Sequence, residues 1–158
     1  MMNKQTTTMR KSVVIADHYE KIDGRNAYKS DVECLSLGLS EKDEQKGTIC
    51  ANVYKRSQED GQITETIPVH RVIDLAILIC RSNLYFQDAY RLPKLYDPEN
   101  PQIDRIGLQG DAMNVAVCTE NPLLDEDIQQ FYQLLSEDGE MLGERLRVLS
   151  RLLEELGY

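Results

Sequence analysis

The sequence predicts an α+β protein: an antiparallel β-meander packed against a central, buried helix and two C-terminal helices. Three observations lead to this class. In the first part of the chain, apolar and polar residues alternate with the period of strands. From residue 69 the apolar period becomes helical. Two later stretches, 122–136 and 140–156, each carry one apolar stripe, as helices that pack on a core through one face do.

Four short segments are predicted as strands. The first, 12–16, is a β-branched run bounded by polar residues, and 32–39, 49–54 and 63–67 show alternation. Because short turns separate the later segments, we expect neighbouring strands to pair antiparallel. Polar residues on the other face indicate a sheet that is packed on one side only.

A predicted helix and a long segment without regular periodicity lie between the predicted meander and the two C-terminal helices. Residues 69–85 carry apolar residues around most of the helix circumference, which predicts a buried helix. Residues 86–110 are interrupted by prolines and glycines and are interpreted as a long ordered excursion, a type of segment that is often functional. A further strand is predicted near 113–118, and Asp138-Gly139 separates the last two helices.

Length and charge limit the function classes. The chain has 158 residues, which predicts one domain over 12–158 behind a disordered tail, 1–11. The net charge of −9 would repel a nucleic-acid duplex, so binding of long DNA or RNA is not expected. We expect no membrane partner, because no apolar run approaches the length of about 18 residues that spans a bilayer. The polar tail does not resemble a signal peptide, which predicts a cytoplasmic protein.

The cysteine pattern does not indicate a metal site. The four cysteines are far apart, form no C-x-x-C pair and are accompanied by only two histidines. Each cysteine lies in an apolar stretch, so we expect buried thiols and no disulfide in a reducing compartment. No bound metal and no other cofactor is predicted. The residues concerned are Cys34, Cys50, Cys80 and Cys118.

The predicted central helix carries the first candidate site. His70, Asp74 and Arg81 fall on one stripe at helical spacing, with Arg71 at its flank. Asp74 interrupts an apolar run and must therefore face solvent or find a cation. Because Arg71 and Arg81 are the obvious partners, we predict a hydrogen bond from one of them to Asp74. One interpretation is a polar cluster at the mouth of a pocket, with His70 as acid, base or ligand contact. The alternative is an exposed stripe with an ordinary ion pair.

A second candidate is the polar loop after the first strand, which contains His18, Tyr19, Lys21 and Arg25. Gly24 would let the backbone approach a ligand closely. The loop lacks G-x-G-x-x-G and the P-loop ending, so no specific phosphate-binding motif is present. Its alternative interpretation is a solvated loop.

The third candidate lies in the excursion, where Tyr90 and Arg91 belong to an aromatic and cationic segment, 85–96. Aromatic rings beside arginine stack on bases or anchor protein interfaces. The alternative is that these rings pack back on the core.

Residues 70–79 (HRVIDLAILI), together with 21–25 (KIDGR), resemble a small bacterial or phage family of unknown function. The resemblance covers roughly residues 12–85. It implies no particular fold, ligand or reaction, and it assigns no site residue.

Three functional hypotheses follow. The first is a non-catalytic protein that binds a small ligand, sequestering or sensing a nucleotide-like signalling molecule, similar in general character to the acidic sponges that phages encode. The second is a protein-interaction or inhibitory module, and the third is a hydrolase. The sequence leans against an enzyme without deciding the question. We also expect a homo-oligomer, most simply a dimer through the C-terminal helix, whose leucine stripe is wide.

Overall fold

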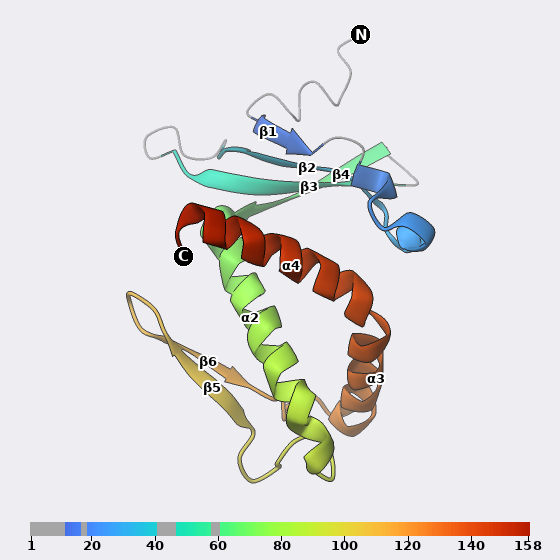
Figure 1. Ribbon diagram of the computed structural model, residues 1–158, viewed down its shortest axis with the longest axis vertical. Coiled ribbons are helices and arrows are strands. Elements are labelled where there is room, and N and C mark those ends of the chain that lie inside the picture. The colour runs from blue at the N-terminus through green and yellow to red at the C-terminus, as the bar shows by residue number, and fades with distance from the viewer. Residues whose placement is uncertain (1–11, 17–18, 41–46, 58–60) are drawn as a thin grey trace. The chain divides into compact units, whose positions relative to one another are not determined.

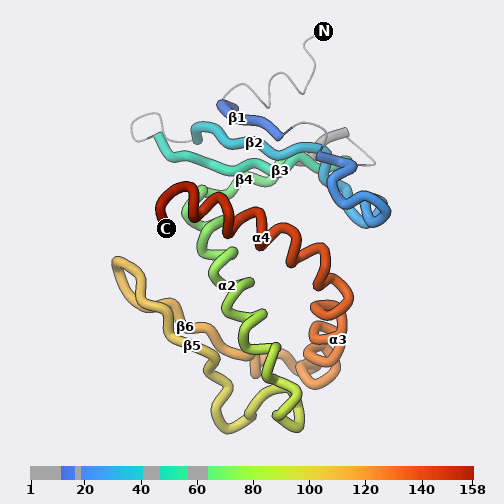
Figure 2. The backbone as a smooth tube through the Cα atoms, viewed as in Figure 1, coloured from blue at the N-terminus to red at the C-terminus, as the bar shows by residue number. Residues whose placement is uncertain are grey.

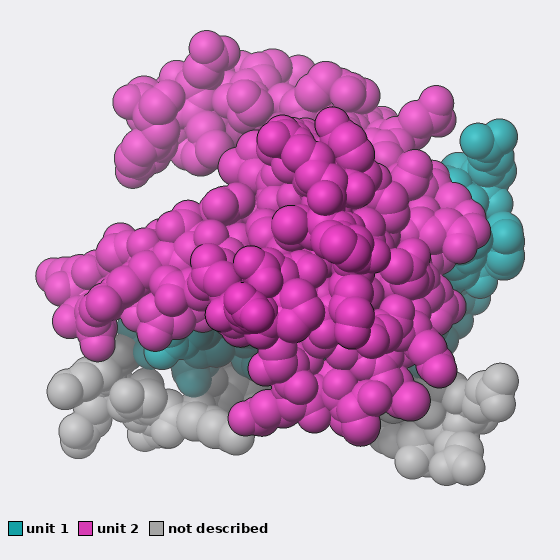
Figure 3. All heavy atoms as spheres, turned by 90° about the horizontal axis from the view of Figure 1, so that it is seen from below, with its two compact units in different colours: residues 1–76 teal, residues 77–158 magenta. Residues whose placement is uncertain are grey.

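The computed structural model describes residues 12–16, 19–40, 47–57 and 61–158. The predicted tail, 1–11, lies outside them. The chain separates into two compact units, residues 1–76 and 77–158, which Figure 3 colours separately. The division falls inside α2 (Val69–Asp88), so this helix belongs to both units. The sequence predicts one domain; we describe each unit by itself.

The first unit contains a four-stranded antiparallel sheet in the strand order of the chain (Figure 1). The predicted meander is confirmed, and its first two strands have the expected bounds. The polar loop between them forms two short 3-10 helices. The elements are β1 (Ser12–Ala16), η1 (Tyr19–Lys21), η2 (Gly24–Lys29), β2 (Val32–Leu39), β3 (Ile49–Ser57) and β4 (Gly61–Pro68).

A row of polar side chains crosses all four strands on one face of this sheet. Ser36 lies opposite Asn52, and Asn52 lies opposite Thr66. Thr66 donates to the Asn52 amide oxygen (2.8 Å), and the Asn52 amide donates to the Ser36 hydroxyl (3.1 Å). Ser12 donates to the same Ser36 oxygen (3.0 Å), and the Tyr54 hydroxyl lies 3.1 Å from Ser36 and 3.3 Å from Ser12. Each strand therefore contributes to one hydrogen-bonded network.

This network fixes the register of the sheet. Tyr54 is 0% exposed and Ser36 is 4% exposed, so their hydroxyl groups depend on protein partners. A slip of one residue would turn every side chain of a strand to the other face and leave these buried groups without hydrogen bonds. The polar row thus specifies one register, although it places polar groups in a buried layer of the sheet.

The second unit combines the later part of α2 with a hairpin and two helices, whose paths Figure 2 traces. The predicted C-terminal helices and central helix are confirmed, and so is the α+β class. The elements are η3 (Ala89–Arg91), β5 (Gln102–Gly107), β6 (Ala112–Ala116), α3 (Leu124–Glu137) and α4 (Gly139–Leu156).

The core of the second unit is a small cluster of buried residues, with partly buried aromatic rings packed against it. The half-buried Phe86 is one of these rings, with ring centroids 5.2 Å from Tyr85 and 5.3 Å from Phe131. Leu95 is buried although its backbone has φ +64°, a left-handed conformation that is unusual for leucine. The other buried members are Ala89, Tyr96, Val117 and Ile128.

Three predictions differ from the structure. No residue of α2 is buried, because the division between the two units falls within this helix and no single core surrounds it. The excursion contains regular structure, since α2 continues to Asp88, η3 follows it and β5 spans Gln102–Gly107. Cys50 is buried and Cys34 half-buried, but Cys80 and Cys118 are exposed. The prediction of buried thiols, which rested on apolar neighbours in the sequence, is therefore wrong for Cys80 and Cys118.

We predict that Tyr54→Phe lowers the free energy of unfolding by about 1 kcal/mol, because both hydrogen bonds of the buried hydroxyl are lost. Urea unfolding followed by circular dichroism measures the change. Tyr28→Phe is the matched control, because Tyr28 is 81% exposed and should tolerate the substitution. Equal stability of the two variants would contradict a stabilising role for the polar row.

Candidate functional site

An open cavity of about 450 Å³ lies on the second unit. Its volume is within the range of small-molecule sites in proteins. The lining residues come from the end of α2 and from the segment that follows it, so one short stretch of chain builds the site. They are Arg81, Leu84, Tyr85, Gln87, Asp88, Ala89 and Leu92.

Helical spacing brings most of these residues together. Arg81, Leu84, Tyr85 and Asp88 follow one another at intervals of three, one and three residues, which places them on one face of α2. At Asp88 the helix gives way to η3, which turns the chain so that Leu92 reaches the same cavity. The result is an apolar wall with charged and amide groups at its edge.

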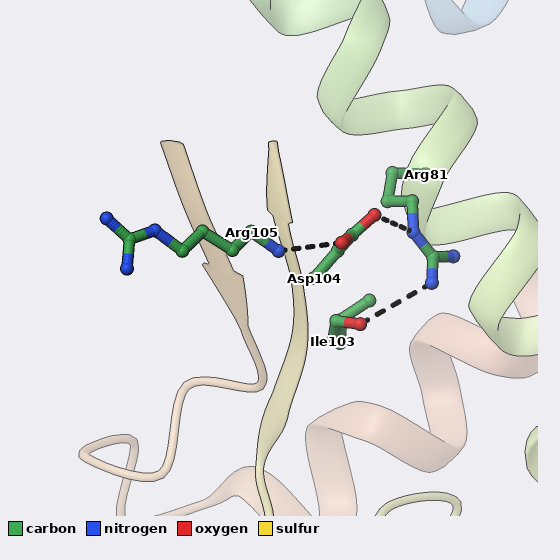
Figure 4. Close-up of polar contacts among 4 residues, drawn as sticks. All are labelled: Arg81, Ile103, Asp104 and Arg105. Atoms are coloured by element: carbon green, nitrogen blue, oxygen red, sulfur yellow. Dashed lines mark hydrogen bonds and ion pairs between the residues drawn. The ribbon is translucent and has the colours of Figure 1, made fainter. Parts of the chain in front are cut away.

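The Arg81 guanidinium is held in place by the β5 strand (Figure 4). Its Nε–H donates to the Asp104 carboxylate at 2.8 Å, and an Nη2–H donates to the Ile103 carbonyl oxygen at 3.4 Å. The Arg81 hydrogen bond, supported by one from the Arg105 backbone N–H, lowers the pKa of Asp104 from its ordinary value. The cation therefore has a fixed orientation and a neighbouring anion that offsets part of its charge.

The surroundings of two further groups, Tyr85 and Arg91, raise their pKa values. Burial, and secondarily the negative charge of Asp97, raises the pKa of Tyr85, so its hydroxyl keeps its proton at neutral pH. Asp88 accepts a hydrogen bond from Arg91 at 2.9 Å, and this bond raises the pKa of the already cationic Arg91. The cavity therefore offers a phenol O–H and a carboxylate that is paired at the rim.

The electrostatic setting of the cavity is acidic. Residues 77–158 contain 7 Lys and Arg against 15 Asp and Glu, a net charge of −8, whereas residues 1–76 contain 11 against 12, a net charge of −1. Almost the whole negative charge of the chain thus belongs to the unit that carries the cavity. This field opposes ligands with several negative charges.

The candidate residues are divided between the two units. Arg71 and Asp74 pair at 3.3 Å in the first unit, which confirms the predicted hydrogen bond of Asp74. His70 is exposed at the start of α2, and Arg81 pairs with Asp104. Tyr19, Lys21 and Arg25 lie in or beside the 3-10 helices of the first unit, and His18 lies outside the described residues. Tyr90 and Arg91 are exposed on η3 of the second unit, next to the cavity-lining Ala89.

Sequence reasoning missed several residues of this site. Gln87 and Asp88 belong to the candidate segment 85–96 but are not singled out by the sequence, because the predicted helix ends at residue 85. The spacing of Arg81, Leu84 and Asp88 would have shown the shared face had the helix been extended. The sequence places Asp104 in the excursion, because 102–107 (QIDRIG) has its two isoleucines three residues apart and so lacks the alternation of a strand.

Among the residues that the structure describes, no group of three or more His, Cys, Asp or Glu side chains is placed to hold a metal ion. Within the same residues, none of the helices has both the length and the apolar character needed to cross a membrane.

DUF6530, a family of unknown function, matches residues 2–158. The chain belongs to this family. The predicted relationship to a family of unknown function is thereby confirmed, and it extends over far more of the chain than the resemblance at 12–85 implied; a bacterial or phage source stays a prediction. No curated protein and no solved structure matches this DUF6530 chain.

We predict that Asp104→Asn destabilises the chain more at pH 7 than at pH 3. Because the folded state lowers the pKa of Asp104, the ionised carboxylate stabilises the fold above its ordinary pKa of about 4. This contribution is lost as the pH falls through the lower, folded-state value. Urea unfolding at both pH values measures the difference.

Asp111→Asn is the matched control, since Asp111 lies on the same hairpin and is strongly exposed, 3.7 Å from Arg105. A destabilisation by Asp104→Asn that stays constant from pH 7 to pH 3 would show that the Arg81 ion pair is not its cause.

Proposed function

We propose that this protein is a non-catalytic binder of a small ligand, with the cavity on residues 77–158 as its binding site. The observation that carries the proposal is the convergence of Arg81, Tyr85, Gln87 and Asp88 on one apolar cavity of suitable volume. Such a combination, an apolar lining with a few placed polar groups, is the usual character of small-molecule sites.

The polar groups indicate what the ligand presents. A guanidinium has five N–H donors, and the bonds of Arg81 to Asp104 and Ile103 use two of them. The others are available to a carbonyl, a carboxylate or a single phosphate group. Gln87 adds an amide that both donates and accepts, and the Tyr85 hydroxyl adds another donor.

The apolar groups indicate the body of the ligand. Leu84, Ala89 and Leu92 supply apolar surface beside the Tyr85 ring, which suits a flat, mostly uncharged ring system. The net charge of −8 on this unit opposes several phosphates. For a nucleotide-like ligand, the site therefore favours a nucleoside or nucleoside monophosphate over a triphosphate. Sequestering or sensing such a molecule is the corresponding role.

Isothermal titration calorimetry with adenosine, guanosine, their monophosphates and their triphosphates tests the proposal on the full chain. We expect binding of a nucleoside or monophosphate, and weaker binding of the matching triphosphate. Gln87→Ala should weaken that binding about tenfold, as expected when a buried polar contact to a ligand is lost.

Gln130→Ala is the matched control, because Gln130 is also an exposed helical glutamine but lies on α3, outside the cavity lining. Binding that weakens equally in both variants would place the ligand elsewhere, and heat of binding from the triphosphates alone would contradict the proposed ligand class.

A further inference from the structure

Both charged side chains that line the cavity are paired with groups of opposite charge. Arg81 and Asp88 are the charged members of the lining. Arg81 pairs with Asp104 at 2.8 Å, and Asp88 pairs with Arg91 at 2.9 Å. Tyr85 is neutral, because burial raises the pKa of its hydroxyl. The cavity therefore offers hydrogen-bonding groups to a ligand while its own charges are balanced.

Asp104 is held as an anion beside Arg81. Its Oδ2 accepts a hydrogen bond from the Arg81 Nε–H at 2.8 Å, and its Oδ1 accepts one from the Arg105 backbone N–H at 2.7 Å. These bonds favour the ionised carboxyl group and lower its pKa, the Arg81 bond most strongly. At neutral pH the negative charge of Asp104 therefore opposes the positive charge that Arg81 presents to the cavity.

The nearby charged groups do not restore the positive charge of Arg81. Arg105 is the next residue after its carboxylate partner, but the Arg105 guanidinium extends away from Arg81 (Figure 4) and lies 3.7 Å from Asp111. Asp97 adds a negative charge that acts on the cavity lining, since it contributes to the raised pKa of Tyr85. The charges around the cavity thus leave no excess of cations to attract an anion.

This balance separates the two ligand forms that the cavity volume admits. A neutral ligand needs only hydrogen-bond partners, and a guanidinium that uses two of its five N–H groups keeps three for a carbonyl or hydroxyl oxygen. A phosphate group accepts the same bonds, but it carries a charge of about −1.5 to −2 at neutral pH. That charge meets the Asp104 carboxylate as well as the guanidinium.

We propose that Asp104 makes the cavity selective for neutral ligands, so that a nucleoside binds more tightly than its monophosphate. Asp104 is outside the cavity lining and acts through Arg81, so it is a positioning residue rather than a ligand contact. Because this selectivity concerns the same cavity, it rests on the proposed function. It adds the charge of the ligand and the residue that determines the preference.

Isothermal titration calorimetry at pH 7 with adenosine, guanosine and their monophosphates compares the parent chain with Asp104→Asn. We expect the parent to prefer the nucleoside. In Asp104→Asn, the ratio of the two Kd values should move about tenfold toward the monophosphate, because one negative charge beside the phosphate is removed. A purely structural role of Asp104 would weaken both ligands alike and leave this ratio unchanged.

Two further variants separate the position of the charge from its presence. Asp111→Asn removes the same charge from the same hairpin, but Asp111 approaches Arg105 and not Arg81, so the ratio should stay at the parent value. Asp104→Glu keeps a carboxylate at the position and should also retain the preference for the nucleoside.

A measurement on the parent alone guards against unfolding of Asp104→Asn. The affinity for the monophosphate should rise as salt is raised, because screening weakens the repulsion between the phosphate and the acidic surroundings of Arg81. The affinity for the nucleoside should change little. A monophosphate affinity that falls with salt would show that Arg81 attracts anions despite its partner, which would overturn the proposal.

The remaining outcomes are distinguishable from one another. Nucleoside binding with an unchanged ratio in Asp104→Asn would refute the role of Asp104 and leave the proposed function intact. An equal change of the ratio in Asp111→Asn would assign the selectivity to the total charge of the unit. If none of these compounds binds the parent, both the proposed function and the selectivity are wrong.

Discussion

The ion pair between Arg81 and Asp104 joins the β5–β6 hairpin to α2, and it holds in place a guanidinium that lines the cavity. A two-stranded hairpin is at best marginally stable alone in water. This one gains stability from Ile103, which packs against the core, and from Arg81, which bonds both the Asp104 carboxylate and the Ile103 carbonyl oxygen. The same contact that anchors the hairpin thus orients the cation offered to a ligand.

The two units reach a defined structure by different means. In the first, the hydrogen bonds of a polar row centred on Ser36 and Tyr54 favour one strand register over the others. In the second, a small buried cluster forms the core, and the partly buried Phe86 packs against it and contacts two further rings. Within that cluster, Tyr96 ties the loop after η3 to α3 by donating to Asp125 at 3.1 Å. That bond, after burial, contributes to the raised pKa of Tyr96.

Much of the fold could be predicted from the sequence, because the spacing of apolar residues indicates directly whether a segment is a helix or a strand. The strands at 12–16 and 32–39 and the two C-terminal helices followed from it. The candidate site was harder to predict from the sequence. Arg81 could be singled out as a cation on an apolar helix, but its partner Asp104 lies 23 residues away, on a hairpin that prolines and glycines in the flanking sequence obscured. Periodicity predicts that a helix has an apolar side, and it does not predict what covers that side, as α2 and α4 both show.

The backbone of Leu95 places two demands on one residue. Its left-handed conformation would suit glycine, yet its side chain is buried in the core of the second unit. Glycine would relax the backbone and leave a hole; valine or isoleucine would fill the space, but their branched Cβ makes this conformation still more costly. Apolar residues unbranched at Cβ, such as leucine and methionine, therefore meet both demands better than glycine, valine or isoleucine do.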